Sequence, residues 1–173
     1  MSWYRLKKTI ANSIICHKYP FLKYFADSNR FFIRSCWFDA IDTGWRGIFL
    51  QMCEEIKQAM ERDDTHFRIH NIKEKDGSLD IDYSAGGEDI DKIIEKYEYI
   101  SYHTCIVCGR PAFGYTDGWV APYCKKCAPK HSPIFEFGTV DDPWYDYYDP
   151  QKKGDKPVYL GKHWISHFDD PNM

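Results

Sequence analysis

Two stretches of the chain repeat apolar residues with the period of an α-helix. In residues 45–60 the apolar positions are three or four apart, and charged or amide side chains fill the positions between them. Asp42 or Thr43 lies just before this stretch and is a candidate N-cap. Residues 89–101 show a second apolar stripe that begins with acidic residues. We therefore expect two main helices, each with one buried face.

An alternating pattern between these helices predicts antiparallel strands. Residues 67–75 form one extended segment, and Asp76-Gly77, which follows it, is a hairpin turn signal. In residues 79–83 apolar side chains alternate with aspartates, which gives one apolar and one acidic face. The pattern predicts a small antiparallel sheet packed against the two helices, so the fold class is α+β.

A third helical stripe lies at the N-terminus, in residues 1–16, and the Tyr19-Pro20 pair after it is expected to end the helix. A basic amphipathic helix of this kind can lie on a membrane surface. The commoner arrangement packs the apolar stripe against the helix's own domain, and we expect it here. The stripe consists of Trp3, Leu6, Ile10 and Ile14, and the basic residues off it are Arg5, Lys7 and Lys8.

Four cysteines form two CxxC pairs, Cys105 with Cys108 and Cys124 with Cys127, separated by 15 residues. This spacing lets two knuckles face each other and complete a tetrahedral site of four thiolates, for which Zn²⁺ is the expected ion. Gly109 follows the first pair and eases the tight turn of a knuckle. A redox dithiol would need only one CxxC pair. Because four protein ligands close the coordination sphere, we predict one structural zinc.

Length and cysteine content limit the possible domain organisation and cellular compartment of the protein. The chain has 173 residues, and three of its seven cysteines lie outside the CxxC pairs, namely Cys16, Cys36 and Cys53. This odd number and the lack of a signal peptide predict a reducing cytoplasm. No segment approaches the ~20 apolar residues of a membrane span. We expect a basic N-terminal helix at 1–16, an α+β core at 17–131 with the zinc element at 103–131, and a tail at 132–173.

The tail is acidic, aromatic and interrupted by prolines. It is too aromatic for an ordinary disordered segment, so we expect it to wrap the domain in extended form or to bind a partner. Tyr and Trp are frequent anchors of protein interfaces. The candidate partner-binding residues are Trp144, Tyr145, Tyr147, Tyr148 and Trp164.

Charge is unevenly distributed along the chain. Residues 1–40 carry seven Lys/Arg against two Asp/Glu, whereas residues 41–131 carry 12 against 16 and residues 132–173 carry four against eight. The basic N-terminal segment can meet an acidic partner, a nucleic acid or the chain's own tail. A nucleic-acid-binding zinc ribbon is the alternative function, although the pI of about 6.1 is low for one. Its candidate contacts, near the cysteine pairs, are Arg110, Lys125, Lys126 and Lys130.

Patterns typical of enzymes are missing. The sequence contains no Walker loop, GxSxG or HExxH motif, and no His-x-Glu element of a zinc deaminase. We therefore expect a protein that is not an enzyme. Several histidines could still act near a metal: His103 and His131 as donors to zinc thiolates, and His66 with His70 or His163 with His167 as a second metal site.

Several short motifs, taken in order, form a recognisable set. They are Tyr19-Pro20, Asp42-Thr43-Gly44-Trp45, Lys73-Glu74-Lys75-Asp76-Gly77, Cys105-Ile106-Val107-Cys108-Gly109-Arg110-Pro111, and Gly118-Trp119 before Cys124-Lys125-Lys126-Cys127. Over residues 17–131 the chain resembles an uncharacterised family of small zinc-containing proteins of tailed bacteriophages and prophages. Members usually have Phe where this chain has Asp76, and often His in place of Cys127. The resemblance implies a phage origin and no particular activity.

Together these features predict a non-enzymatic, zinc-stabilised phage accessory protein. We expect it to act in the host cytoplasm by binding a host or phage protein, as a defence inhibitor or a host-takeover factor. Nucleic-acid binding remains the alternative.

Overall fold

The computed structural model describes residues 3–24, 26, 29–116, 118–130, 132–136, 158–160 and 163–165. For residues 135–136 and the last two segments it describes the backbone alone. Within these residues, no helix combines the length and the apolar character needed to cross a bilayer.

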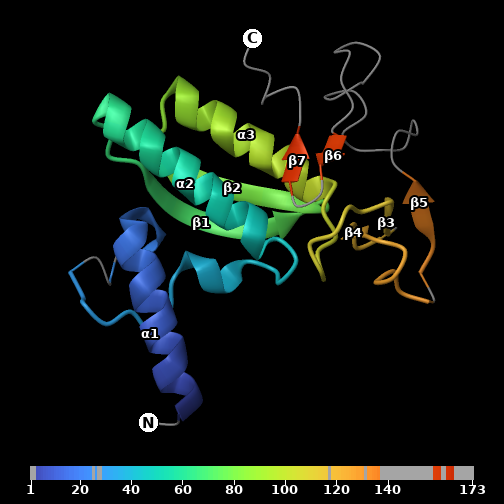
Figure 1. The fold of residues 1–173 in the computed structure, drawn as a ribbon, viewed down its shortest axis with the longest axis horizontal. Helices are drawn as coiled ribbons and strands as arrows, with labels where there is room; N and C mark the ends of the chain where they lie inside the picture. The colour runs from blue at the N-terminus through green and yellow to red at the C-terminus, as the bar shows by residue number, and fades with distance from the viewer. Residues whose placement is uncertain are drawn as a thin grey trace.

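Two helices lie side by side on one face of a two-stranded antiparallel sheet (Figure 1). Helix α2 spans Arg46–Asp63 and helix α3 spans Glu88–Tyr102. The sheet consists of β1, Arg68–Lys75, and β2, Ser78–Ser84. The predicted α+β class is confirmed.

The core forms where the apolar stripes of α2 and α3 meet the sheet. Trp45, Phe49 and Ile56 have no exposed surface, and Ile90 is equally buried on α3. Burying an apolar side chain of this size contributes about 1.5–3 kcal/mol, so this stripe adds strongly to the stability of the body, which consists of α2, α3, β1 and β2. Cys53 lies on the same buried face, as its place in the apolar pattern predicts.

The start of α2 differs from the expectation. The helix begins at Arg46, its N-cap residue is Trp45, and no side chain caps it. The predicted cap by Asp42 or Thr43 is therefore wrong. The turn before the helix instead makes hydrogen bonds to the cysteine-containing segment after α3, as described below.

The β1–β2 hairpin follows the sequence pattern closely. Lys75 pairs with Ser78 across a two-residue turn, in which Asp76 and Gly77 have φ angles of 49° and 83°. Positive φ at both central residues is what a type I′ turn requires. The backbone N–H of Leu79 donates to Ser101 Oγ of α3 at 2.8 Å, which joins the sheet to the helix near the metal element.

Helix α1, Trp3–Lys18, packs on the body through a different and mainly polar face from the predicted one. Its buried residues are Thr9, Asn12, Ser13 and Cys16. Three of the four residues of the predicted stripe face solvent instead: Trp3 is 70 % exposed, Ile10 47 % and Ile14 65 %, whereas Leu6 is half-buried. The expectation that this stripe packs on its own domain is wrong.

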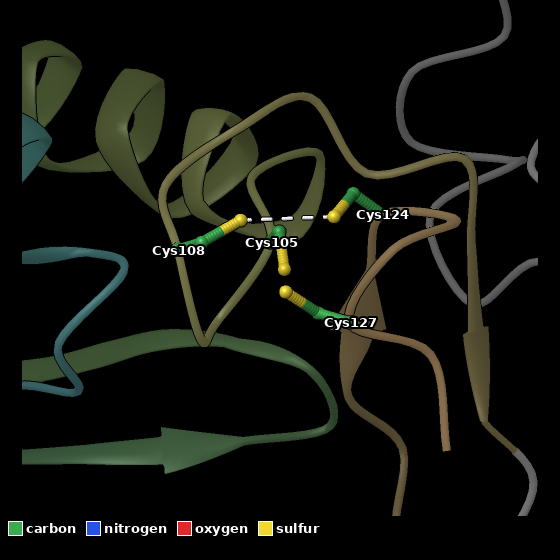
Figure 2. Close-up of side chains that lie close together, drawn as sticks. All are labelled: Cys105, Cys108, Cys124 and Cys127. Carbon is green, nitrogen blue, oxygen red and sulfur yellow. Dashed lines mark hydrogen bonds between the residues drawn. The ribbon is translucent and has the colours of Figure 1, made fainter. Parts of the chain in front are cut away.

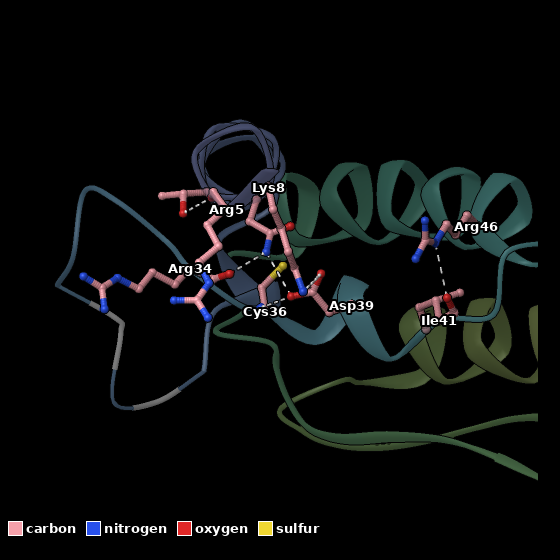
Figure 3. Close-up of polar contacts among 9 residues, drawn as sticks. Arg5, Lys8, Arg34, Cys36, Asp39, Ile41 and Arg46 are labelled. Atoms are coloured by element: carbon pink, nitrogen blue, oxygen red, sulfur yellow. Dashed lines mark hydrogen bonds and ion pairs between the residues drawn. The ribbon is translucent and has the colours of Figure 1, made fainter. Parts of the chain in front are cut away.

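Hydrogen bonds explain the orientation of α1 (Figure 3). Asn12 Nδ2 donates to the carbonyl of Arg34 at 3.1 Å and to Asp39 Oδ2 at 2.9 Å. Ser13 Oγ accepts from the backbone N–H of Ile33 at 2.9 Å. The segment 33–39 thus uses the polar side of α1 to satisfy its own buried polar groups, and the helix cannot turn its apolar side inward without losing these bonds.

The remaining elements are short. The 3₁₀ turns η1 and η3 span Pro20–Leu22 and Trp37–Ala40. After α3, the strands β3 (Gly114–Thr116), β4 (Pro122–Tyr123) and β5 (Ile134–Glu136) form an antiparallel sheet in the order β4-β3-β5. The strands β6 (Val158–Leu160) and β7 (His163–Ile165) pair as a separate hairpin.

The tail residues predicted to bind a partner, Trp144, Tyr145, Tyr147 and Tyr148, lie outside the described residues, and so does the side chain of Trp164.

Candidate metal centre

The four cysteines of the two CxxC pairs point their sulfurs at one another (Figure 2). All four Sγ atoms lie within 4.8 Å of one another, and Cys108 Sγ is 3.6 Å from Cys124 Sγ. All four thiols are free of disulfide bonds. The structure therefore brings together the four residues that the sequence singles out as metal ligands.

These distances fit a tetrahedral ion. A Zn–S bond of about 2.3 Å places neighbouring sulfurs roughly 3.8 Å apart at tetrahedral angles. The measured separations, 3.6 Å for one pair and at most 4.8 Å for the others, need only small shifts to reach that value. Soft thiolate ligands in this arrangement are typical of structural zinc. The donor set therefore can hold a metal ion, and Zn²⁺ fits it well.

Each CxxC pair forms a tight backbone turn. The N–H of Gly109 donates to the carbonyl of Cys105 at 2.9 Å, and Gly109 has φ of +71°. The N–H groups of Cys127 and Ala128 both donate to the carbonyl of Cys124 at 3.0 Å. These turns direct both sulfurs of a pair to the same side. Glycine adopts the required left-handed backbone without strain, which explains its place after the first pair.

Burial and hydrogen bonding give the four thiols different acidities. Although burial disfavours its thiolate, hydrogen bonds from the backbone of Cys127 and the thiol of Cys108 lower the pKa of Cys124 to about 7. A hydrogen bond to Cys108, together with burial, raises the pKa of Cys127 to about 12. Burial also raises the pKa of Cys105. Because a metal binds thiolates, an ion that enters this site must displace protons.

The turn before α2 holds the first knuckle against the body. The N–H of Gly44 donates to the carbonyl of Ile106 at 2.9 Å. Trp45, with no exposed surface, donates from Nε1 to the carbonyl of Thr104 at 2.8 Å. A Cβ on Gly44 would overlap the carbonyl of Cys105. The Gly44-Trp45 pair, which looks like a helix start in the sequence, is thus the docking point of the metal element.

The second knuckle belongs to the small β3–β4 hairpin. Gly114 pairs with Tyr123, and the N–H of Ile106 donates to the carbonyl of Pro122 at 3.0 Å. The strand that pairs with β3 is Pro122–Tyr123, whereas Trp119 lies in the connecting loop. The centre therefore joins three parts of the chain: the start of α2, the end of α3, and this hairpin.

The basic residues proposed for nucleic-acid binding, Arg110, Lys125, Lys126 and Lys130, are all exposed near the knuckles. The ammonium of Lys125 lies 5.7 Å from the centre of the Phe113 ring. A Zn²⁺ ion with four thiolates carries an excess of negative charge. With such an ion bound, these cations would offset part of that negative charge.

Histidines do not add to the centre in the described residues. The Nδ1 atom of His103 lies 3.0 Å from the carbonyl of Tyr99, and its ring contacts the Tyr99 ring. His70 Nε2 lies 2.8 Å from Ser84 Oγ, and His66 lines a separate hollow with Phe21. His131, His167 and the side chain of His163 lie outside the described residues.

The three other cysteines are buried away from the metal centre, on α1, in the segment before α2, and on α2. Cys16, Cys36 and Cys53 have no exposed surface. Burial raises the pKa of Cys53, and a hydrogen bond to Cys36, together with burial, raises that of Cys16. Cys53 thus lacks the accessible, acidic character of a nucleophile.

A surface hollow beside the centre is a feature that the sequence does not indicate. It measures about 370 Å³ and is lined by Asp42, Thr43, Ile106, Val107, Trp119, Ala121 and Tyr123. Trp119 is 74 % exposed and Val107 is 50 % exposed. Its lining comes from three segments far apart in the sequence, so only the folded metal element creates it.

Comparisons with protein-family models, with curated proteins and with solved structures give no match to this chain.

Proposed function

We propose that this chain is a non-enzymatic, zinc-stabilised protein that acts by binding another protein. The observation that carries this proposal is the exposed Trp119 beside the hollow at the metal centre. Tryptophan is the side chain most enriched at the energetic centres of protein interfaces. We call this region, formed by Ile106, Val107, Trp119 and Tyr123, the metal-element surface.

The chemistry of the cysteine site supports a structural role. When all four ligand positions of the ion come from protein thiolates, none remains for a substrate or an activated water. The hydrogen bonds from Gly44 and Trp45 attach the metal element to the α2 helix. On this proposal the metal shapes the metal-element surface and takes no part in a reaction.

The partner is, on this proposal, a host or phage protein in the cytoplasm of an infected bacterium. This part rests on the resemblance to small phage proteins and on the ordered motifs of residues 17–131. A role as a defence inhibitor or a host-takeover factor fits such a partner.

Affinity capture from bacterial lysate with matched baits tests the proposal. The baits are the wild type, Trp119→Ser, and Trp3→Ser as a control with similar exposure on a distant helix. We expect a specific protein that the wild type and Trp3→Ser capture at equal yield and that Trp119→Ser loses. Capture that is unchanged by Trp119→Ser would contradict the assignment of the surface.

Two further measurements separate the alternatives. Nucleic-acid binding predicts retention of generic duplex or single strand at about 50 mM salt, where electrostatic binding is strong. It also predicts loss of binding in the double variant Lys125→Glu/Lys126→Glu. A bait that ends at residue 136 tests whether the tail contributes, and equal recovery of the same partner would remove the tail from the interface.

A further inference from the structure

Helix α1 exposes apolar residues on one side and buries polar residues on the other. The stripe of Trp3, Ile10 and Ile14 recurs at helical spacing, so these side chains lie along a single face. That face points away from the body, because Trp3 is 70 % exposed, Ile10 47 % and Ile14 65 %. Figure 1 shows the N-terminal turns of α1 extending beyond the other elements.

Two phenylalanines extend the apolar face. Phe31 and Phe32 are 69 % and 67 % exposed, and their rings lie 5.2 Å apart. The Phe31 ring lies 4.9 Å from the ring of His17 on α1. The hydrogen bond from Ile33 N–H to Ser13 Oγ anchors this loop to the helix. We call the combined face of Trp3, Ile10, Ile14, Phe31 and Phe32 the α1 surface.

The surroundings of the α1 surface are strongly basic. Residues 3–38 carry seven Lys/Arg and one Asp/Glu, and α1 itself has no acidic residue. Asp39 pairs with Lys8 at 3.2 Å and Glu54 pairs with Lys18 at 2.9 Å. When Asp39 and Glu54 are added to the count for residues 3–38, the totals are seven Lys/Arg and three Asp/Glu. Lys7 lies 5.1 Å from the centre of the Trp3 ring, so charge and aromatic surface are adjacent.

We propose that the α1 surface binds an anionic lipid bilayer and holds the protein at the membrane as a peripheral protein. Trp and Tyr favour the boundary between headgroups and acyl chains, and Trp3 and Tyr4 both lie exposed at the N-terminal end of α1. Lysines and arginines beside such a face are attracted to acidic headgroups. The cytoplasmic leaflet carries negative surface charge, which suits the basic end of this chain.

The positive charge of α1 argues against a second copy of this chain as the partner of the α1 surface. Two α1 surfaces in contact would bring together two helices that each have four Lys/Arg and no Asp/Glu, and like charges at an interface oppose association. The two hollows described above lie elsewhere, one beside Trp119 and one beside Phe21 and His66. An exposed apolar stripe flanked by cations suits the surface of an anionic bilayer.

Vesicle flotation with the full-length protein tests the proposal. The probes are phosphatidylcholine vesicles and vesicles with about one-third phosphatidylglycerol. We expect the wild type to float with the anionic vesicles and to remain in solution with the neutral ones. The double variant Trp3→Ser/Ile14→Ser should bind at least tenfold more weakly, and Lys7→Glu should bind more weakly by roughly fivefold for each unit of charge removed.

The control variant is Trp119→Ser, which removes an equally exposed tryptophan from the metal-element surface. It should float like the wild type, whereas Trp3→Ser should keep the protein partner proposed above. The two proposals can therefore be contradicted independently, since a substitution on the α1 surface reports on lipid binding and Trp119→Ser reports on protein binding.

Several results would overturn the proposal. They are the absence of flotation, equal binding to neutral vesicles, and equal flotation of Trp3→Ser/Ile14→Ser and wild type. A dimer in light scattering that this double variant dissolves would assign the α1 surface to a second copy. Carbodiimide cross-links from Lys7 or Lys18 to residues 141–149 in the absence of lipid would assign it to the tail.

Discussion

The side-chain amide of Asn12 donates a 2.9 Å hydrogen bond to the carboxylate of Asp39, and this contact orients the N-terminal helix. The same carboxylate accepts from the N–H of Cys36 at 3.3 Å and pairs with Lys8 through its other oxygen. Asp39 thus binds α1 to the segment that precedes α2. Since Asn12 and Cys36 are buried, their hydrogen bonds with Asp39 decide which side of α1 faces the body, and most of the apolar stripe is left outside.

The first prediction concerns this contact. Asn12→Ala removes two hydrogen bonds, to the carbonyl of Arg34 and to Asp39, although the Asp39 carboxylate keeps its contacts with Cys36 and Lys8. We expect the free energy of unfolding to fall by about 1–3 kcal/mol, measured by urea denaturation. Ile14→Ala, on the exposed side of the same helix, should change it by no more than about 0.5 kcal/mol. A larger loss of stability in Ile14→Ala than in Asn12→Ala would mean that the apolar stripe, and not the polar side, holds α1 on the body.

The second prediction concerns Gly44. In Gly44→Ala the new methyl group would overlap the carbonyl of Cys105 and come within 2.6 Å of the carbonyl of Ile106. The metal element must then move away from α2, at a cost of about 1–3 kcal/mol or more. Thermal unfolding with and without a chelator would measure both the loss and its link to the metal.

Gly47 is the matched control for Gly44. It lies in the first turns of α2, and a Cβ there meets nothing within 4 Å. Because alanine favours the helix, Gly47→Ala should raise the free energy of unfolding by about 0.5–1 kcal/mol. Similar effects of the two substitutions would show that Gly44 is not in close contact with the knuckle.

The third prediction concerns the metal. Purified protein should contain one Zn²⁺ per chain by elemental analysis, and Cys124→Ser should lose it together with cooperative unfolding, because binding energy at such a site is folding energy. Cys53→Ala removes a buried thiol outside the site and should keep the full metal content. A folded Cys124→Ser protein without metal would refute the structural role.

The fourth prediction concerns Glu98. Burial, with further contributions from Asp80 and Glu95, raises its pKa from 4.5 to about 7, against a hydrogen bond from the N–H of Ile81 and the charge of Lys75. The folded state therefore holds a proton that the unfolded state releases between these two values. The free energy of unfolding should fall as pH rises through this window, by roughly 1–2 kcal/mol with solvent screening allowed for.

Glu98→Gln keeps an acceptor for Ile81 but cannot ionise. It should match the wild type near pH 4.5, exceed it by roughly 1 kcal/mol at pH 8, and remove the fall between these values. Urea titrations at several pH values measure this difference. Glu88→Gln, an exposed residue that pairs with Lys92 on the same helix, should keep the wild-type profile. Parallel profiles for Glu98→Gln and wild type would contradict the prediction.

Local patterns predicted much of the body. The apolar spacing of residues 45–60 and 89–101 corresponds to α2 and α3, and the Asp76-Gly77 turn joins β1 to β2 as an antiparallel hairpin. The two CxxC pairs predicted the cluster of Cys105, Cys108, Cys124 and Cys127. These features depend on short-range geometry, such as helical period, turn conformation and knuckle spacing, so a single sequence contains them.

Such local patterns do not predict contacts between segments that lie far apart in the sequence. The stripe of Trp3, Ile10 and Ile14 has the spacing of a buried face, yet Asn12 and Ser13 take the inner side because segment 33–39 offers them hydrogen-bond partners. Gly44 has the appearance of a helix start, but its N–H contacts the carbonyl of Ile106 in a knuckle 62 residues later in the chain.

The amino-acid sequence was enough to predict the fold class and the cluster of four cysteines, since both follow from periodicity and spacing. The tertiary structure decided which surfaces the protein presents to others. Which residues are buried depends on how all segments pack together, and in α1 hydrogen bonds to residues far away in the sequence determine the buried face. The exposed α1 surface and the hollow beside Trp119 both result from this packing of distant segments.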